Sequence, residues 1–261
     1  MTPYSSITVT IQDKIATVTI ERAHARNALN AEAIRELTSA FTGLSTNSDI
    51  RCVLLRGSGT DAFCSGADLQ ELQKTSIPET RRDFFTAIAT LIQAIQQCSH
   101  PTVSLVYGFA LAGGLGLVAA SDIVIAADDA QFGLPEVAVG LAPLVVAAPL
   151  SRVLSPRGLD YLALTGDRIG APEALKLGLV TKVAPKESAL SESLSLCRTI
   201  ATRGPAAVQA TKMALRDTRA SNSNSAFIYE LADRSALVSL GDEASEGIKA
   251  FTDKRSPTWK G

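Results

Sequence analysis

The chain has 261 residues, 46% of them hydrophobic, which is enough for one large domain or for a core with a small appendage. Its 25 basic and 26 acidic residues give a formal net charge of −1. No basic stripe is present to attract a nucleic acid, and no apolar run reaches the roughly 18 residues that a membrane-spanning helix needs. We therefore expect neither a nucleic-acid nor a membrane partner.

The cysteines and the N-terminus indicate a compartment. Four cysteines are widely scattered and form no CxxC pair, which is typical of a reducing cytosol: Cys52, Cys64, Cys98 and Cys197. The opening residues MTPYSSITVTIQDK lack a basic segment followed by an apolar one, so no signal peptide is expected. The prediction is a cytoplasmic protein.

The first elements are a hairpin, a helix and a strand. Apolar and polar residues alternate over Ile7–Gln12 and Ile15–Ile20, with Asp13-Lys14 between them, which predicts a β-hairpin. Asn30 stands before AEAIRELTSAFTGL, whose apolar residues recur at helical spacing, so Asn30 is a candidate helix cap. A short buried strand is expected at Cys52–Leu55.

Helices and buried strands then alternate. A helix is predicted from about Glu79 to Cys98, and Pro101 ends this region. Buried strands are expected at Thr102–Val106 and Ile123–Ile125. Strands that are apolar on both faces and alternate with helices predict an α/β fold with a parallel layer.

The second half becomes helical. A short helix is expected at Pro172–Gly178, followed by a last strand at Leu179–Val183. From Glu187 almost to Lys254 the pattern is helical, with three breaks, at Gly204-Pro205, at Ser221–Ser225 and at Gly241. We predict a βα core over residues 1–200 and a helical C-terminal module over 201–261.

A glycine cluster follows the predicted strand Thr102–Val106. The stretch FALAGGLGLVAASD places Gly113 and Gly114 at the start of an apolar helix, where backbone N–H groups have no intrahelical partner. The helix dipole favours negative charge there, and a missing side chain lets a ligand oxygen approach the backbone. This is one half of an oxyanion hole. Close packing of the helix is the simpler interpretation of the same glycines.

A second small-residue turn follows the strand Cys52–Leu55. In DAFCSGADL, Asp68 is placed to cap a helix, and two strands of one sheet would then present backbone N–H groups at the same edge. A nucleophilic Ser65 or Cys64 would need a neighbouring base. The only histidines, His24 and His100, have no obvious partner, so neither hydrolase chemistry nor a histidine metal site is expected.

A glutamate stands in the apolar stretch QFGLPEVAVGLAPLVVAAPL. Burial would raise the pKa of Glu136 and suit it to act as a general acid or base near neutral pH. The alternative is a surface glutamate that caps a helix beginning near Pro143. The local sequence favours neither.

Taken in this order, these stretches resemble the crotonase superfamily, that is, the enoyl-CoA hydratase/isomerase family. ERAHARNALN, FCSGADL, LAGGLGL, QFGLPEVAVGL and the ending EGIKAFTDKRSPTW all fit its pattern, although Ala23 replaces the usual proline. The resemblance implies a spiral of ββα units, a C-terminal trimerisation module and trimers often paired into hexamers. It also implies an acyl-CoA thioester substrate, with no cofactor besides the coenzyme A of the substrate and no metal.

The resemblance also implies the site residues. The oxyanion donors are the N–H groups of Ala67 and Gly113, and the acid/base is Glu136. Coenzyme A is expected along one set of residues: Arg26, Ala28, Ala67, Asp68, Leu69, Gln70, Gly113 and Gly114. Phe251 and Lys254 would cover the adenine and its phosphate, from the same or a neighbouring subunit. For Lys254 the alternative is a solvated charge near the chain end.

One position departs from the two-glutamate hydratases of the family. Gly116 stands where they carry the first glutamate, which leaves Glu136 alone. One carboxylate suffices to move a proton between carbons, as isomerisation requires, and it could also serve hydration through a bound water. Gly116 would mark either a lost carboxylate or room for a branched acyl group. A non-catalytic acyl-CoA-binding or partner-binding protein remains the alternative from another class.

Overall fold

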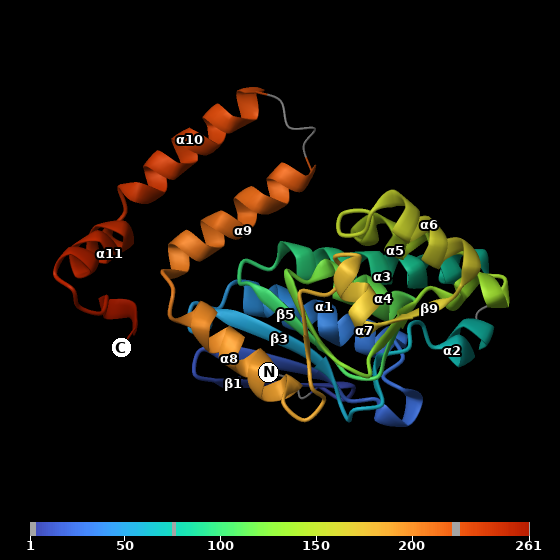
Figure 1. The fold of residues 1–261 in the computed structure, drawn as a ribbon. Helices are drawn as coiled ribbons and strands as arrows, with labels where there is room; N and C mark the ends of the chain where they lie inside the picture. Colours follow the sequence, from blue (N-terminus) through green and yellow to red (C-terminus); the bar gives the residue numbers. More distant parts are fainter. Residues whose placement is uncertain (1–3, 75–76, 221–224, 261) are drawn as a thin grey trace.

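Two β-sheets lie at the centre of the computed structural model, which describes residues 4–74, 77–220 and 225–260 (Figure 1). The larger sheet has six strands in the order β1-β2-β3-β5-β7-β10. It starts with the predicted hairpin of β1 (Ile7–Gln12) and β2 (Ile15–Ile20). Asp13 and Lys14 both have positive φ in its two-residue turn, which matches the twist of the paired strands. The hairpin prediction is confirmed.

The rest of the larger sheet is parallel. β3 (Cys52–Gly57), β5 (Thr102–Val106) and β7 (Ile123–Ala127) are almost entirely buried, as their apolar sequences predict. The edge strand β10 (Lys182–Ala184) begins later than expected. The apolar pair Leu179-Val180 packs into the core from a turn, so its hydrophobicity does not mark a strand.

A smaller sheet carries four strands of three residues each, in the order β4-β6-β8-β9. They are β4 (Ala62–Cys64), β6 (Phe109–Leu111), β8 (Gln131–Gly133) and β9 (Arg168–Gly170). The first three follow β3, β5 and β7, and a helical segment follows each in turn. The α/β prediction of repeated ββα units is therefore confirmed.

Helices cover the sheets on the side of the smaller sheet. α1 (Ala31–Ser45) packs against α3 (Pro78–Gln97), and the Asn30 side chain accepts a hydrogen bond from Ala33 N at 2.9 Å, as the cap prediction requires. α4 (Gly113–Ala120) is buried along its whole length between α3 and α5 (Leu144–Leu150). The remaining helices of this part are α2 (Leu69–Lys74), α6 (Pro156–Thr165) and α7 (Ala171–Lys176).

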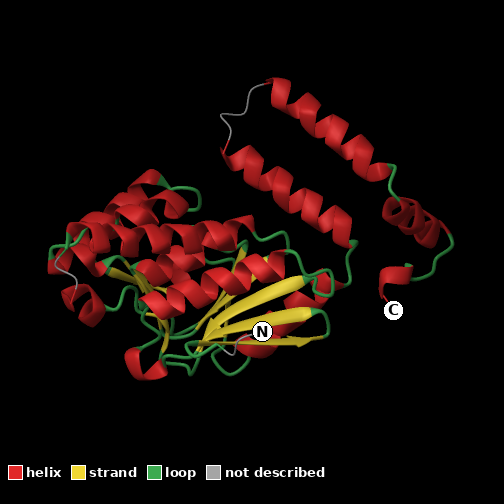
Figure 2. Cartoon of the chain, turned by 180° about the vertical axis from the view of Figure 1, so that it is seen from behind, coloured by secondary structure: helices red, strands yellow, loops and turns green. Residues whose placement is uncertain are grey.

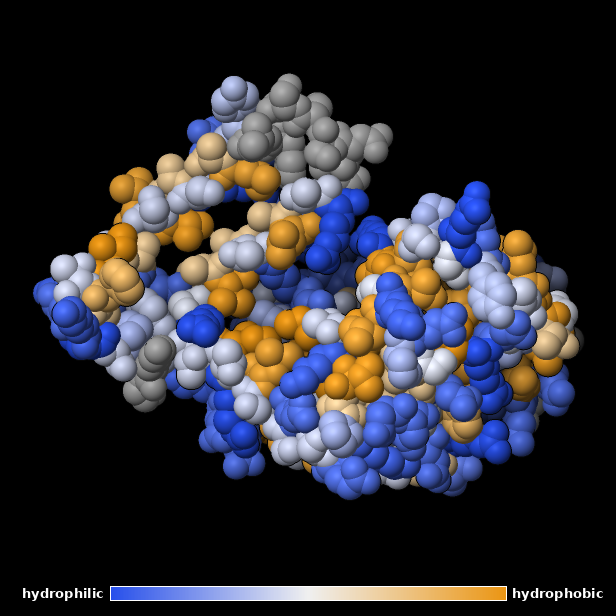
Figure 3. Space-filling view, viewed as in Figure 1, coloured by the Kyte–Doolittle hydropathy of each residue, from blue (hydrophilic) through white to orange (hydrophobic). Residues whose placement is uncertain are grey.

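The C-terminal helices leave the core after α8 (Ala189–Ala201), which packs on β3 and β5. α9 (Pro205–Ala220), α10 (Ser225–Ser239) and α11 (Asp242–Thr252) extend away from the sheets (Figures 1 and 2). Figure 3 shows apolar surface on these helices beside a hollow that separates them from the core. The breaks at Gly204-Pro205 and Gly241 are confirmed; 221–224 lie outside the described residues.

The division into residues 1–200 and 201–261 stays a prediction. In the described part of the chain, no helix has both the length and the apolar character needed to cross a bilayer.

Candidate active site

The turn between β4 and α2 points one backbone N–H into the site. Leu29 N donates to Gly66 O at 2.7 Å, and Asp68 N donates to Leu29 O at 2.9 Å. The Gly66 carbonyl and the Ala67 N–H belong to one planar trans peptide and point in opposite directions. Because the carbonyl is held towards Leu29, the Ala67 N–H is directed to the other side.

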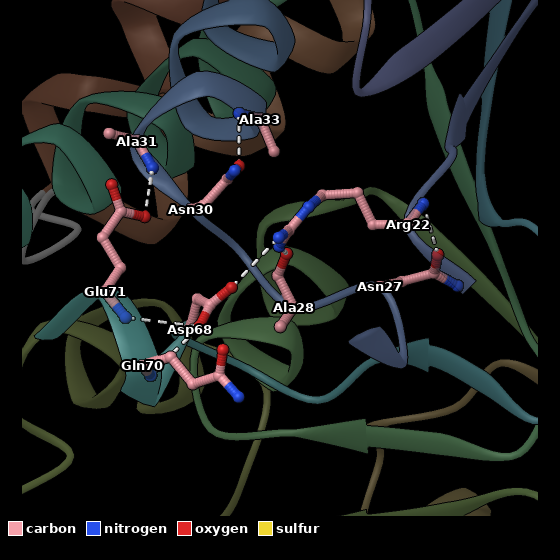
Figure 4. A network of polar contacts seen from close by, with 9 residues as sticks. All are labelled: Arg22, Asn27, Ala28, Asn30, Ala31, Ala33, Asp68, Gln70 and Glu71. Atoms are coloured by element: carbon pink, nitrogen blue, oxygen red, sulfur yellow. Dashed lines mark hydrogen bonds and ion pairs between the residues drawn. The ribbon is translucent and has the colours of Figure 1, made fainter. Parts of the chain in front are cut away.

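An ion pair anchors this turn (Figure 4). The Arg22 guanidinium lies 3.0 Å from the Asp68 carboxylate and also donates to the Ala28 carbonyl, and both side chains are mostly buried. Asp68 also accepts hydrogen bonds from the N–H groups of Gln70 and Glu71, which confirms it as the cap of α2. Burial alone would raise the Asp68 pKa, but the hydrogen bonds and charge of Arg22 and the α2 N–H groups lower it overall. The Asp68 carboxylate thus holds the turn.

Asn27 is a structural residue that the sequence interpretation missed. Its side chain accepts from Arg22 N at 3.0 Å and donates to the carbonyls of Ser58 and Ala62 at 3.1 and 2.7 Å. It is buried and has φ +55°, a conformation that asparagine tolerates better than most residues. Asn27 therefore joins the loop before α1 to the start of β4. The presence of Asn27 in the stretch ERAHARNALN was the sequence feature that could have indicated this role.

The second turn, between β6 and α4, is held by packing. Ala112 has φ +50° and ψ −125°, which is rare for a residue with a side chain. Its carbonyl accepts from Gly116 N at 3.2 Å, so the Gly113 N–H of the same peptide points out of the helix start. A Cβ added to Gly66 would lie 2.6 Å from Ala112 Cβ, and one added to Gly113 would lie 3.8 Å from Ala67 N. The two turns therefore touch, and Gly113 lies beside the backbone nitrogen of Ala67.

Gly113 and Gly114 differ in what surrounds them. A Cβ on Gly114 would lie 2.3 Å from Cys64 O, whereas a Cβ on Gly113 would meet only ordinary contacts, the nearest at 3.5 Å from Leu29 Cδ1. Gly114 is thus required for the close packing of α4 on β4. The packing interpretation of the cluster is confirmed for Gly114, and the oxyanion interpretation stays a prediction for Gly113.

Glu136 lies on the short 3-10 helix η2 (Pro135–Val139), not on the helix that begins at Leu144. Its Oε2 atom is buried and has no hydrogen-bond partner among the described residues. Burial raises the pKa of Glu136, and a hydrogen bond to its own backbone N–H offsets only part of this effect. A half-buried carboxylate of raised pKa, with one oxygen free of hydrogen bonds to the described residues, is suited to take up and release a proton near neutral pH.

Two cavities meet at Glu136 and Ala67. The larger, of about 690 Å³, has Arg22, His24 and Arg26 in its lining and includes several of the predicted coenzyme A residues: Arg26, Ala28, Ala67, Asp68, Leu69 and Gln70. The smaller, of about 40 Å³, is lined by Gly113 and by apolar side chains of α3 and α5, among them Phe85, Ile88 and Val146. The site thus joins a wide opening with cationic side chains to a small apolar pocket.

The comparisons identify the family. Residues 10–261 match the model of the enoyl-CoA hydratase/isomerase family. The chain belongs to this family. It is 32% identical to a probable enoyl-CoA hydratase of Mycobacterium bovis over 97% of each chain. It is 33% identical to the crotonyl-CoA hydratase of Syntrophomonas wolfei over 97% of this chain and 96% of the other.

Solved structures agree with this assignment. The enoyl-CoA hydratase of Bacillus anthracis superposes with a TM-score of 0.93 at 29% identity, covering 98% of this chain and 100% of that one. The chain is thus an enzyme of the enoyl-CoA hydratase/isomerase family, and nothing supports the non-catalytic alternative.

Gly116 does not open the site of this family member. A Cβ at this position would lie 2.6 Å from Val146 Cγ1 and 3.2 Å from Ile92 Cδ1. The interpretation that Gly116 makes room for a branched acyl group is therefore wrong: the space beside it is filled by α5 and α3.

Phe251 and Lys254 do not reach the cavities of their own chain. They lie at the end of α11 and just after it, on the opposite side of the molecule from α2 (Figure 1). Phe251 is 87% exposed. Their assignment to coenzyme A stays a prediction and requires a neighbouring subunit.

The nucleophile and metal alternatives find no support in the described residues. Burial raises the pKa of the Cys64 thiol to about 12, so it is protonated at neutral pH. His100 is buried, with its Nε2 atom 3.1 Å from the Asn47 carbonyl oxygen. Among the described residues, no group of three or more His, Cys, Asp or Glu side chains is placed to hold a metal ion.

Proposed function

We propose that this enzyme shifts the double bond of a 3-enoyl-CoA thioester to the 2-position, with Glu136 carrying the proton. The observation that supports this is the unpaired Glu136 carboxylate where the two cavities meet, with Val146 filling the space beside Gly116. Asp68, the other carboxylate in the lining, is tied to Arg22. The site therefore offers one group that can exchange protons with a substrate.

The proposed reaction needs no other group. The Glu136 carboxylate removes a proton from the carbon next to the thioester carbonyl, and the carbonyl oxygen becomes an enolate oxygen. The N–H groups of Ala67 and Gly113 stabilise that charge, and one such donor is typically worth about 3 kcal/mol. Protonated Glu136 then returns the proton two carbons further along, so that atoms and charges balance. No metal or separate cofactor takes part.

Substrate binding follows from the two cavities. The coenzyme A part would lie in the larger one, where Arg22 and Arg26 favour its phosphates, along Ala67–Gln70. The acyl group would enter the small apolar pocket. Gly113 contributes its N–H, whereas Gly114 supports the helix behind it.

We also propose that the chain works as a homotrimer or a dimer of trimers. Leu237, Leu240, Ile248 and Phe251 are exposed on the C-terminal helices, and a second copy would cover such a surface. In that assembly Phe251 and Lys254 of a neighbouring copy would cover the adenine. The free, buried cysteines support a cytoplasmic location.

Hydration of a 2-enoyl-CoA is the second candidate, and the names of the relatives favour it. The relatives from M. bovis and S. wolfei are described as hydratases. Glu136 would then take a proton from a water molecule as its hydroxide adds to C3, and would return this proton to C2.

A pair of four-carbon substrates separates the two reactions. Vinylacetyl-CoA would be isomerised, and crotonyl-CoA would be hydrated. We expect kcat/KM for isomerisation to exceed that for hydration, and Glu136→Gln to abolish both. Faster hydration of crotonyl-CoA would reject isomerisation in favour of the second candidate, and turnover of neither thioester would reject both.

A further inference from the structure

The contact between Gly116 and Val146 joins two parts of the chain that are distant in sequence. Gly116 lies inside the fully buried α4, and Val146 lies on α5 with 3% of its surface exposed. Val146 Cγ1 lies too close to Gly116 to leave room for a side chain, since a Cβ at position 116 would be only 2.6 Å away. The valine is thus seated on the glycine, and neither residue can grow without displacing the other.

The same valine forms a wall of the small pocket. Val146 lines this pocket together with Gly113 and Glu136, the groups that would meet the thioester and its neighbouring carbon. Phe85 and Ile88 of α3 also line the pocket. Its volume is about 40 Å³, against about 690 Å³ for the larger cavity. The space beyond the reacting carbons is therefore short, and Val146 helps to close it.

We propose that Val146, held in place by its contact with Gly116, sets the acyl-chain length that this enzyme accepts and limits it to short, unbranched acyl groups. This inference rests on the proposed function only in assigning the small pocket to the acyl group. A longer chain must push aside Val146, whose side chain is buried against Gly116 of α4. Removing its two γ-methyl groups lengthens the pocket into the space above Gly116.

Binding of saturated thioesters tests this without requiring turnover. Calorimetry with butyryl-CoA, hexanoyl-CoA and octanoyl-CoA gives the affinity as a function of chain length for the wild type and for Val146→Ala. We expect the wild type to bind octanoyl-CoA about tenfold more weakly than butyryl-CoA, and the variant to lose this difference, since a mismatch of one or more methylenes is worth tenfold or more.

Val124→Ala is the matched control. Val124 is a valine of β7, buried to a similar degree (4% exposed), and does not line the small pocket. The substitution Val124→Ala removes the same atoms as Val146→Ala and should leave the dependence of affinity on chain length unchanged. Equal affinity of the wild type for all three thioesters would overturn the inference, and so would the same profile in Val146→Ala and the wild type.

A double-mutant cycle of stability measurements tests the contact between Gly116 and Val146. Gly116→Ala places a Cβ against Val146 and should lower the melting temperature. Val146→Ala should lower it by leaving a cavity. The double variant should be more stable than the sum of the two losses predicts, because each change makes room for the other. Strictly additive losses would overturn the contact.

The two proposals fail in distinguishable ways. If Glu136→Gln retains activity while Val146→Ala alters the chain-length profile, the proton-transfer role is wrong and the length limit stands. If Glu136→Gln abolishes turnover but the wild type binds all three saturated thioesters with equal affinity, only the length limit is wrong.

Discussion

The two sides of the cavity are built in opposite ways. On one side, the turns that present Ala67 and Gly113 are tied by hydrogen bonds, the Arg22–Asp68 ion pair and contacts between the turns. On the other side, Glu136 lies half-buried on a short 3-10 helix, with one carboxylate oxygen that no described residue satisfies. This difference fits the proposed roles: oxyanion donors should be held rigidly, and a group that exchanges a proton should have a free oxygen.

The donor side itself uses two kinds of force. The Ala67 turn depends on polar contacts made by side chains far apart in sequence, as Arg22 and Asp68 show. The Gly113 turn depends on the close approach of backbones, at Gly114 against Cys64 and at Gly66 against Ala112. Substitutions on the two sides, and within the donor side, should therefore fail in different ways.

The largest effect on kcat is expected at Glu136. Glu136→Gln keeps the size of the side chain but removes proton transfer, so kcat should fall by about 10³-fold, within the range typical of a general acid or base. Affinity for coenzyme A should change little. Steady-state kinetics on vinylacetyl-CoA and crotonyl-CoA measure this, with Glu173→Gln, at an exposed position on α7, as the control. Near-wild-type turnover in Glu136→Gln would remove this residue from the mechanism.

Adding a single methyl group at Gly113 should strongly reduce kcat. The Cβ of Gly113→Ala meets no atom closer than 3.5 Å, so the protein should fold. It would lie 3.8 Å from Ala67 N, next to the position that we propose for the thioester oxygen. We expect kcat to fall by about 100-fold, the typical effect of losing one oxyanion donor.

The neighbouring glycine gives the contrast. Gly114→Ala should lower the melting temperature, because its Cβ would lie 2.3 Å from Cys64 O. A stable Gly114→Ala, or an active Gly113→Ala, would show that the two glycines have been assigned the wrong roles.

A smaller effect is expected at the anchor of the Ala67 turn. Asp68→Asn loses the ion pair with Arg22 and should reduce kcat by about tenfold, less than the loss of a whole donor. The lowered pKa of Asp68 means that its charge stabilises the fold above the ordinary aspartate pKa, and that this contribution disappears as the pH falls through the lowered value. Thermal denaturation should show Asp68→Asn less stable than the wild type at pH 7 and similar to it near pH 2. An equal loss at both pH values would contradict the role of the charge.

The smallest expected effect is a gain in the stability of Glu136→Gln. The raised pKa of Glu136 means that the folded state resists its ionisation, so stability is highest below the ordinary value of 4.5 and is lost as the pH rises through the raised value. Glu136→Gln should therefore melt slightly above the wild type at pH 8, with no difference below about pH 4. A lower melting temperature at pH 8 would indicate that the ionised carboxylate has partners that stabilise it.

Local sequence is sufficient for much of this molecule. The turn residues Asp13-Lys14, the cap at Asn30 and the apolar runs of β3, β5 and β7 each depend on neighbours within a few residues, so the hairpin, the helix start and the strands could be predicted. The family motifs allowed Ala67, Gly113 and Glu136 to be proposed. The short strands β4, β6, β8 and β9 could not be found, because three residues are too few to show a period.

Only the tertiary structure separates residues that look alike in sequence. Gly113, Gly114 and Gly116 lie within four positions, yet one faces the cavity, one packs on Cys64 and one lies under Val146. The ion pair of Asp68 depends on Arg22, which is distant in sequence and is brought beside it where the Leu29 and Ala67 segments pair. Propensity and spacing act over a few residues, whereas these roles depend on contacts that the chain topology creates between distant segments.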